Sequence, residues 1–439
     1  MCKSITFARG IDELNPMKVF KFGGGVLHSA EAVKKIPAII GLYPGETIIV
    51  VVSALGKTTN ALEELIHASF HNNGDTGFIL KKIIAYHKDI LQGIFPDPNH
   101  PVFHDVQEYW DELSITLNDR KPDAYACFYD QVICFGELVS SMIVSHTFNL
   151  TGIDHHWIDI RRVLKTDSSF REANVDWEKS TENANKEISP YLEGIEGKSP
   201  LLLTQGFIGS DEKGRSTSLG REGSDYTASI LANLFNANEV ITWKDVPGIL
   251  NADPKHFRQT VKLDQISYEE ATELAYYGAK VIHPKTVKPL QNKGIPLQVR
   301  SFDDPRLPGT LIHSGAESDT SIPNFIFKFD QVLISVSTRD LSFINEKVFN
   351  DVFSLLSRFS IHVNIIQNSA LTLSFCVDNH PKFKELVNGL QENYNVKYNQ
   401  GLELITIRHY NEKASELVLQ NKQILLEQQN RTVVQYVVR

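Results

Sequence analysis

Short apolar runs alternate with longer stretches of helical periodicity through the larger, N-terminal part of the chain. The run TIIVVVS within Glu46–Ser53 is continuously apolar and rich in β-branched residues, which is typical of a strand buried on both faces of a parallel sheet. The pattern also predicts strands at Lys18–Phe22, Leu201–Phe207 and Glu239–Trp243, and helices at Thr59–Ser69, Lys81–Ile90, Gln107–Leu117, Ala126–His146 and Tyr226–Phe235. Strands that alternate with helices predict an α/β domain.

The order of predicted strands and helices changes after the segment HSGAESDTSIP, His313–Pro323, whose small and polar residues are typical of a linker. The elements expected within Gln331–Tyr398 follow the order strand, helix, strand, strand, helix, strand, which is the ferredoxin-like unit. A second, partial copy is expected within Leu402–Val438. The sequence therefore predicts an extension at residues 1–16, an α/β domain at 17–312, a linker at 313–323 and an α+β region at 324–439.

The composition is that of a globular protein, because 42% of the 439 residues are hydrophobic and 22% are charged. A formal net charge of −9 argues against broad binding to nucleic acid or to an anionic membrane. The pattern predicts no transmembrane helix and no secretory signal, because no apolar run has the required length and flanking charges. Cysteines without a C-x-x-C pair predict a reducing, cytoplasmic setting.

Three glycines, Gly23–Gly25, follow the first predicted strand and form a candidate phosphate site. Glycine backbone allows close approach, and the N-terminus of a following helix offers unpaired N–H groups. Lys21 could add a compact positive charge. The simpler alternative is a tight turn beside an edge lysine. The chain has no G-x-G-x-x-G Rossmann fingerprint here. Gly56-Lys57-Thr58 does not belong to a Walker P-loop, because that motif needs a glycine five positions before Gly56, where Val51 stands.

A second glycine-rich segment, Thr204–Ala228, contains the most informative charged residues. Arg221 could clamp a carboxylate through two parallel hydrogen bonds. Ser224 and Asp225 could belong to the same site, or each could be the N-cap of the helix that follows. Glu137 could hold a substrate amine, or it could be a carboxylate favoured by a helix dipole.

Two further segments leave alternatives open. The turn within Trp243–Lys255 follows a strand, where open parallel sheets bind ligands, but it could be an ordinary β-turn. His283 is a lone histidine, which is more often structural than a metal ligand, and the pair His155–His156 lacks carboxylate or cysteine neighbours at metal-ligand spacing. No metal site is therefore predicted.

Seven segments, in their order along the chain, resemble the aspartate kinase family. They are KFGG (Lys21–Gly24), VVSALGKTTN (Val51–Asn60), FGELVSS (Phe135–Ser141), TQGFIGS (Thr204–Ser210), LGREGSDYTA (Leu219–Ala228), WKDVPGILNADPK (Trp243–Lys255) and GAKVIHPKT (Gly278–Thr286). The tail resembles the family's ACT regulatory domains. The resemblance implies an amino-acid-kinase fold, with a mainly parallel sheet between helical layers. It also implies transfer of the γ-phosphoryl group of ATP to the β-carboxylate of L-aspartate, the first step toward lysine, threonine and methionine.

The resemblance also implies roles for individual residues. Lys21 and Asp225 would be catalytic, and the nucleotide would contact Lys21, Phe22, Gly23, Gly24, Lys244, Asp245, Leu250, Lys255, Lys280 and Val281. The substrate would contact Ser53, Thr59, Glu137, Arg221 and Ser224, with its ammonium on Glu137 and its α-carboxylate on Arg221. A carboxylate nucleophile is already ionised at neutral pH, so no general base is needed. Mg²⁺ would be held mainly by the ATP phosphates.

The tail would give feedback inhibition by lysine or threonine, with Asp340, Asn364 and Ser369 at the effector site, and a homodimer through the ACT domains. The chain departs from the usual family pattern at Gly25, Val26, Glu222 and Lys244. Two alternatives therefore accompany the aspartate kinase: a kinase for another amino acid, and a non-catalytic amino-acid sensor on a decayed kinase domain.

Overall fold

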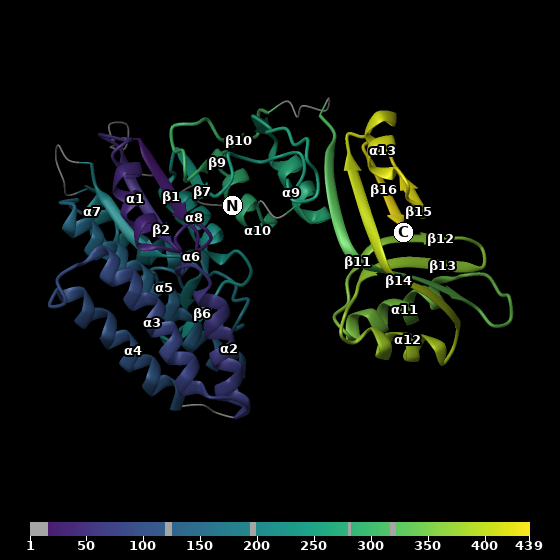
Figure 1. The fold of residues 1–439 in the computed structure, drawn as a ribbon, viewed down its shortest axis with the longest axis horizontal. Coiled ribbons are helices and arrows are strands. Elements are labelled where there is room, and N and C mark those ends of the chain that lie inside the picture. Colours follow the sequence, from purple (N-terminus) through teal and green to yellow (C-terminus); the bar gives the residue numbers. More distant parts are fainter. Residues whose placement is uncertain (1–15, 119–124, 194–198, 280–281, 317–321) are drawn as a thin grey trace, which may run out of the picture. The chain divides into compact units, whose positions relative to one another are not determined.

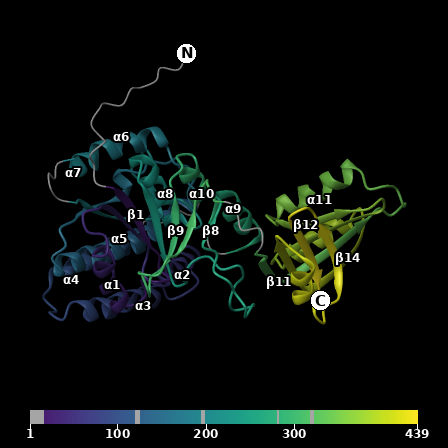
Figure 2. The ribbon, with the colours of Figure 1, turned by 90° about the horizontal axis from the view of Figure 1, so that it is seen from above.

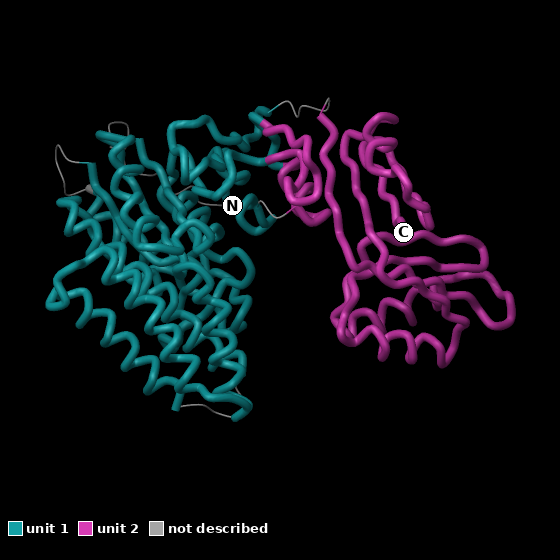
Figure 3. Tube along the Cα trace, in the orientation of Figure 1, with its two compact units in different colours: residues 1–249, 264–268, 282–316 teal, residues 250–263, 269–281, 317–439 magenta. Residues whose placement is uncertain are grey.

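The computed structural model describes residues 16–118, 125–193, 199–279, 282–316 and 322–439. The described chain divides into two compact units, which Figure 3 shows in different colours. Unit 1 lies within residues 1–249, 264–268 and 282–316, and unit 2 lies within residues 250–263, 269–281 and 317–439. Two short segments before residue 282 thus belong to the same unit as the C-terminal part of the chain.

Unit 1 is built around an eight-stranded sheet of order β3–β4–β2–β1–β7–β9–β10–β8 (Figure 1). All neighbouring strands are parallel except β9 and β10. The strands are β1 (Met17–Phe22), β2 (Thr47–Val52), β3 (His156–Ile158), β4 (Leu201–Gln205), β7 (Glu239–Lys244), β8 (Gln265–Ile266), β9 (Leu297–Ser301) and β10 (Thr310–Ile312), with a separate hairpin of β5 (Ile208–Ser210) and β6 (Ser216–Ser218). Every residue of β2 is buried, as its β-branched run predicts. The predicted α/β fold with a mainly parallel sheet is confirmed.

Helices flank this sheet. They are α1 (Ala30–Ile40), α2 (Thr58–His71), α3 (Thr76–Ile94), α4 (Pro101–Asn118), α5 (Tyr125–Leu150), the 3₁₀ helix η1 (Ile160–Arg162), α6 (Trp177–Glu187), α7 (Ser189–Glu193), α8 (Gly223–Phe235) and α10 (Pro284–Gln291). Figures 1 and 2 show α3, α4 and α5 side by side. All five helices expected from periodicity are present and extend further than predicted. The sequence pattern did not predict α6, α7 or α10. In α10, Pro289 lies inside the helix and weakens the helical pattern, whereas Pro284 lies at its first turn, where proline is favoured.

Helix α5, with 26 residues, is the longest of the helices that the structure describes in unit 1. By length and composition alone it is apolar enough to cross a membrane, but 83% of its most apolar window is buried against the rest of the protein. It packs on β2 and β4 and carries the buried carboxylates Asp130 and Glu137. Burial on all sides explains why its sequence is apolar around the whole helix.

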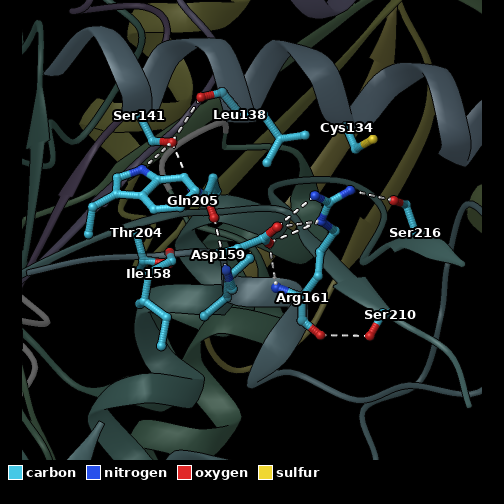
Figure 4. A network of polar contacts seen from close by, with 12 residues as sticks. Cys134, Leu138, Ser141, Ile158, Asp159, Arg161, Thr204, Gln205, Ser210 and Ser216 are labelled. Carbon is cyan, nitrogen blue, oxygen red and sulfur yellow. Dashed lines mark hydrogen bonds and ion pairs between the residues drawn. The ribbon is translucent and has the colours of Figure 1, made fainter. Parts of the chain in front are cut away.

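A network of polar contacts fixes α5 to the sheet and to the β5–β6 hairpin (Figure 4). Gln205, at the end of β4, donates to the hydroxyl of Ser141 in α5 at 2.6 Å and accepts from the backbone of Ile160 at 2.9 Å. Arg161 pairs with Asp159 at 2.6 Å and donates to the Ser216 hydroxyl at 3.0 Å. The hydrogen bonds satisfy polar groups beneath the surface and hold the helix in one position.

Unit 2 contains a six-stranded antiparallel sheet of order β12–β13–β11–β14–β16–β15. Its elements are β11 (Asn324–Ser337), α11 (Glu346–Arg358), β12 (Val363–Asn368), β13 (Thr372–Asp378), α12 (Phe383–Gln391), β14 (Asn395–Arg408), α13 (Glu412–Leu419), β15 (Ile424–Gln429) and β16 (Val433–Val438), and α9 (Tyr268–Tyr277) lies in this unit from residue 269. The element order expected within Gln331–Tyr398 is present, packed around a core that includes Val352 and Phe375. The predicted ferredoxin-like α+β region is confirmed.

The strands β11 and β14 are each longer than the sequence predicted. The N-terminal part of β11 pairs with the C-terminal part of β14, for example Phe325 with Ile407, whereas its C-terminal part pairs with both β13 and β14. A register shift between Lys328 and Gln331 separates the two parts. The second copy, expected to begin at Leu402, therefore also uses the first residues of β11, so each long strand serves both copies.

Candidate active site

A cleft of about 950 Å³ opens in unit 1 at the carboxyl ends of parallel strands. The strands β1, β2 and β7 end at Phe22, Val52 and Lys244, and residues at or just after these ends line the cleft. In parallel sheets, this edge is where ligands bind. The volume suits a nucleotide or a molecule of similar size.

Most residues expected to form the site lie together in this cleft. Its lining includes Lys21, Gly23, Gly24, Ser53, Thr59, Glu137, Arg221, Ser224, Asp225, Lys244 and Asp245. The side chain of Phe22 is fully buried instead and stacks on Trp243, with ring centroids 6.1 Å apart. Leu250 and Lys255 belong to unit 2, and Lys280 and Val281 lie outside the described residues. Contacts of these four residues with a nucleotide stay predictions.

The glycine segment after β1 makes close backbone contacts. A Cβ atom at Gly24 would lie 2.6 Å from the carbonyl oxygen of Ala54 and 2.7 Å from that of Gly56, so no side chain fits there. A Cβ atom at Gly23 would lie 3.1 Å from Nζ of Lys21. At Gly25 such an atom would meet nothing within 4 Å. Gly24 thus holds the loop against the segment after β2, while Gly25 is open.

A buried ion pair joins β1 to α8. Nζ of Lys21 lies 2.7 Å from Oδ2 of Asp225, and both side chains are less than a tenth exposed. Nζ of Lys244 lies 3.8 Å from the same oxygen, and the Thr242 hydroxyl donates to the other oxygen at 3.3 Å. Burial acts to raise the pKa of Asp225, but the charges of Lys21 and Lys244 outweigh it and lower that pKa. Burial lowers the pKa of Lys21, although the charge of Asp225 acts to raise it.

Glu137 lies in α5 with 2% of its surface exposed. Burial raises the pKa of its carboxyl to about 8, although hydrogen bonds from the Ala54 backbone and the Ser53 hydroxyl and the charge of Lys21 act to lower it. Ser53 also accepts a hydrogen bond from the Ser224 hydroxyl at 3.1 Å. A cationic group placed beside Glu137 would offset its loss of solvation and favour the ionised form.

Helix α8 begins one residue before the two proposed capping residues. Its N-cap is Glu222, in a left-handed conformation with φ 54° and without a side-chain capping bond. Ser224 and Asp225 lie in the first turn, so the N-cap alternative for them is wrong. The turn fits closely under β4, because a Cβ at Gly206 would lie 2.5 Å from Cβ of Ser224. The first turn of α8 thereby lies at the cleft, where the N-terminus of a helix favours an anion.

Sequence reasoning missed one wall of the cleft. Glu63, Tyr129, Phe170, Arg171 and Glu172 also line it. The Tyr129 hydroxyl donates to Glu63 at 2.6 Å, and the Arg171 guanidinium lies over the Tyr129 ring at 4.7 Å. Tyr129 stands about two helical turns before Glu137 in α5, which could have pointed to it. The segment SSFRE around Arg171 carries no such signal.

The described residues contain no group of three or more His, Cys, Asp or Glu side chains arranged to hold a metal ion. His283 instead accepts a hydrogen bond from the Lys285 backbone at 3.2 Å, as the N-cap of α10. In the cleft, Oε2 of Glu222 is buried and has no hydrogen-bond partner among the residues that the structure describes. The Glu222 carboxylate in the cleft fits a cation that is held mainly by the phosphates of a ligand and by one carboxylate, as is common for Mg²⁺.

Comparisons with known proteins identify the family. A profile described as the amino acid kinase family matches residues 16–301. Lysine-sensitive aspartokinase 3 of Escherichia coli is 30% identical over 83% of this chain and 79% of its own length. The chain belongs to the aspartokinases of the amino acid kinase family. It is also 26% identical to the bifunctional aspartokinase/homoserine dehydrogenase 1 of Arabidopsis thaliana, over 82% of this chain and 40% of that protein.

Solved aspartokinases share the fold. Aspartokinase III of E. coli in complex with lysine and aspartate superposes with a TM-score of 0.79 and 26% identity over 96% of both chains. Its complex with aspartate and ADP gives 0.78 and 27% over the same shares. The aspartate kinase of Clostridium acetobutylicum, at 22% identity over 96% of both chains, has a TM-score of 0.75 and supports the fold alone.

Proposed function

We propose that the chain transfers the γ-phosphoryl group of ATP to the β-carboxylate of L-aspartate, giving 4-phospho-L-aspartate. The observation that carries the proposal is one cleft in which the buried Lys21–Asp225 pair lies with Glu137 and Arg221. An aspartokinase relative crystallised with aspartate and ADP supports the same pair of ligands.

The phosphate side of the cleft supplies positive charge and close backbone. Lys21 approaches the β- and γ-phosphates, held in place by Asp225. Gly23 and Gly24 let the backbone come near the same oxygens, and the first turn of α8 adds N–H donors. Phosphoryl transfer to an ionised carboxylate needs alignment and charge neutralisation rather than a general base. Lys244 and Asp245, which also line the cleft, contact the nucleotide as well.

The amino-acid side distinguishes the acceptor. Arg221 binds the α-carboxylate, Glu137 binds the ammonium, and Ser53, Thr59 and Ser224 line the path to the phosphate. The ammonium restores the charge that burial removes from Glu137. Mg²⁺ would be held mainly by the ATP phosphates, and Glu222 and Asp245, which line the cleft, would be the carboxylates that add a ligand.

Regulation and assembly belong to unit 2. Lysine or threonine is the proposed inhibitor, and a homodimer forms through this unit, in the cytoplasm. Asn364 bonds to Lys328 at 2.8 Å and to Asp378 at 3.0 Å, so an effector at this position must compete with contacts already made. Asp340 accepts a hydrogen bond from Ser342, and Ser369 accepts one from Thr372, and both stay candidate effector contacts.

One assay tests the proposal. Purified protein with ATP and Mg²⁺ is incubated with aspartate, glutamate or other acceptors, and hydroxylamine traps any acyl phosphate as a hydroxamate. We expect hydroxamate from aspartate and little from glutamate. A signal only from another acceptor contradicts the substrate, and no signal from any acceptor supports a non-catalytic sensor. Added lysine or threonine identifies the inhibitor in the same assay.

A further inference from the structure

The side chain of Arg171 lines the cleft. It lies over the rings of Tyr129, at 4.7 Å, and Tyr125, at 5.8 Å. Its side chain makes no ion pair and no hydrogen bond with any residue in the described parts of the chain. Its donors are therefore free for a ligand, and the two tyrosine rings add cation–π attraction to its charge.

The backbone at Arg171 is held in an unusual conformation. Its φ of 74° is in the left-handed region, which glycine adopts freely and other residues rarely adopt. Its N–H donates to Oδ2 of Asp130 at 2.9 Å. Asp130 is fully buried in α5 and also accepts from the backbone N–H of Ser218, at 2.8 Å, and from its hydroxyl, at 2.6 Å. A strained residue kept in place by a buried carboxylate suggests a functional position.

Asp130 brings together the two loops that carry the arginines of the cleft. Ser218 ends β6 and leads directly to Gly220 and Arg221. A Cβ at Gly220 would lie 3.2 Å from the carbonyl oxygen of Arg171, so the two loops touch. Asp130 and Glu137 stand about two turns apart on α5, which places them on one face of the helix. One helix thus positions Glu137, Arg171 and the start of the Arg221 loop.

The charges in the cleft match an amino acid with an acidic side chain. Lys21 and Lys244 both lie near Asp225, which leaves the guanidiniums of Arg171 and Arg221 for anions of the substrate. We propose that Arg171 is a second specificity residue, which binds the α-carboxylate of aspartate together with Arg221 and leaves the β-carboxylate free to face the phosphate. This rests on the proposed function. The arrangement gives the substrate three charged contacts, with Glu137 on its ammonium.

The variant R171G tests the role without disturbing the fold, because glycine adopts the observed φ without strain. We expect the Tm to stay the same or rise, and the Kd for aspartate, measured by calorimetry with a non-hydrolysable ATP analogue present, to rise about tenfold or more. The KM for aspartate should rise similarly, with kcat changed less than about threefold and the Kd of the ATP analogue unchanged. Millimolar guanidinium ion should partly restore aspartate binding to R171G.

The matched control is R162A, which removes an arginine that pairs with Glu187 and does not line the cleft. It should bind aspartate like the wild type. The role of Arg171 is overturned if R171G binds aspartate normally, or if it loses affinity for the ATP analogue instead. Wild-type protein that neither binds aspartate nor forms its hydroxamate contradicts the proposed function itself, so the two failures are distinguishable.

Discussion

Nζ of Lys21 lies 2.7 Å from Oδ2 of Asp225, although the two residues stand 204 positions apart in the chain. The contact joins the end of β1 to the first turn of α8, inside the cleft. Both partners are buried, so each depends on the other to remain charged.

Removal of one partner should cost both activity and stability. We expect D225N to lower kcat at least about 10²-fold, because Lys21 loses the charge that positions it. It should also lower the free energy of unfolding by about 3 kcal/mol, since an uncompensated lysine remains buried. Enzyme assays and urea titrations measure the two effects.

A double variant and a surface pair serve as controls for D225N. The variant K21M/D225L should be no less stable than D225N, because it leaves no buried charge. The pair of half-exposed Lys35 and exposed Asp303, 3.0 Å apart, should contribute less, with D303N costing under about 1 kcal/mol. Equal costs for D225N and D303N would contradict the importance assigned to the buried pair.

The carboxyl of Glu137 should make stability depend on pH. Its pKa is raised from 4.5 to about 8 in the folded protein, so between these pH values the folded state binds a proton that the unfolded state releases. The contribution of Glu137 to stability therefore falls as pH rises through this window, by a few kcal/mol at about 1.4 kcal/mol per pKa unit. Urea titrations at pH 6 and pH 8 should show a smaller decline for E137Q than for the wild type. Parallel declines would rule out this titration.

Aspartate binding should release a proton from Glu137. An ammonium placed beside this carboxyl favours its ionised form, so at pH 7 binding should release up to about one proton. The affinity for aspartate should rise from pH 6.5 to pH 8. Calorimetry in two buffers with different ionisation enthalpies measures the release. Binding without proton release, or weaker binding at the higher pH, would show that the ammonium lies elsewhere.

Adjacent glycines in the first loop should respond differently to alanine. G24A places a methyl group within 2.7 Å of two carbonyl oxygens, so the backbone must move. We expect a loss of about 1–3 kcal/mol in stability and a raised KM for ATP. G25A is the matched control, because a methyl group there meets nothing within 4 Å, and it should change either quantity little. Similar effects of the two variants would contradict the close contact at Gly24.

Local patterns were sufficient to predict the centre of unit 1. The β-branched run of β2 and the glycines after β1 predicted buried strands and a loop at their carboxyl ends, where the structure has its cleft. The contact of Lys21 with Asp225 depends on the packing of α8 against β1, which no local pattern gives, and only the family resemblance assigned the two residues to one site. The shift in the pKa of Glu137 could not be predicted, because it depends on the burial of α5 by segments distant in sequence.

Other features depend on tertiary structure alone. Arg171 reaches the cleft because the buried carboxylate of Asp130 holds its loop, a contact between residues 41 positions apart. The length of β11 was underestimated because its first residues pair with the far end of β14 rather than with a neighbour in sequence. Likewise, the two-residue strand β8 is too short to give an alternating pattern.

The sharing of β11 and β14 by both halves of the six-stranded sheet also limits how unit 2 can come apart. Each strand has 14 residues and is hydrogen-bonded along most of its length to the other. If one half of the sheet unfolded, the backbone N–H and C=O groups of the strands in the other half would lose their hydrogen-bond partners. Hydrogen exchange should therefore show the amides of both halves opening together, as one cooperative element. A chain that ends between the two halves should be unable to form the remaining half of this sheet on its own.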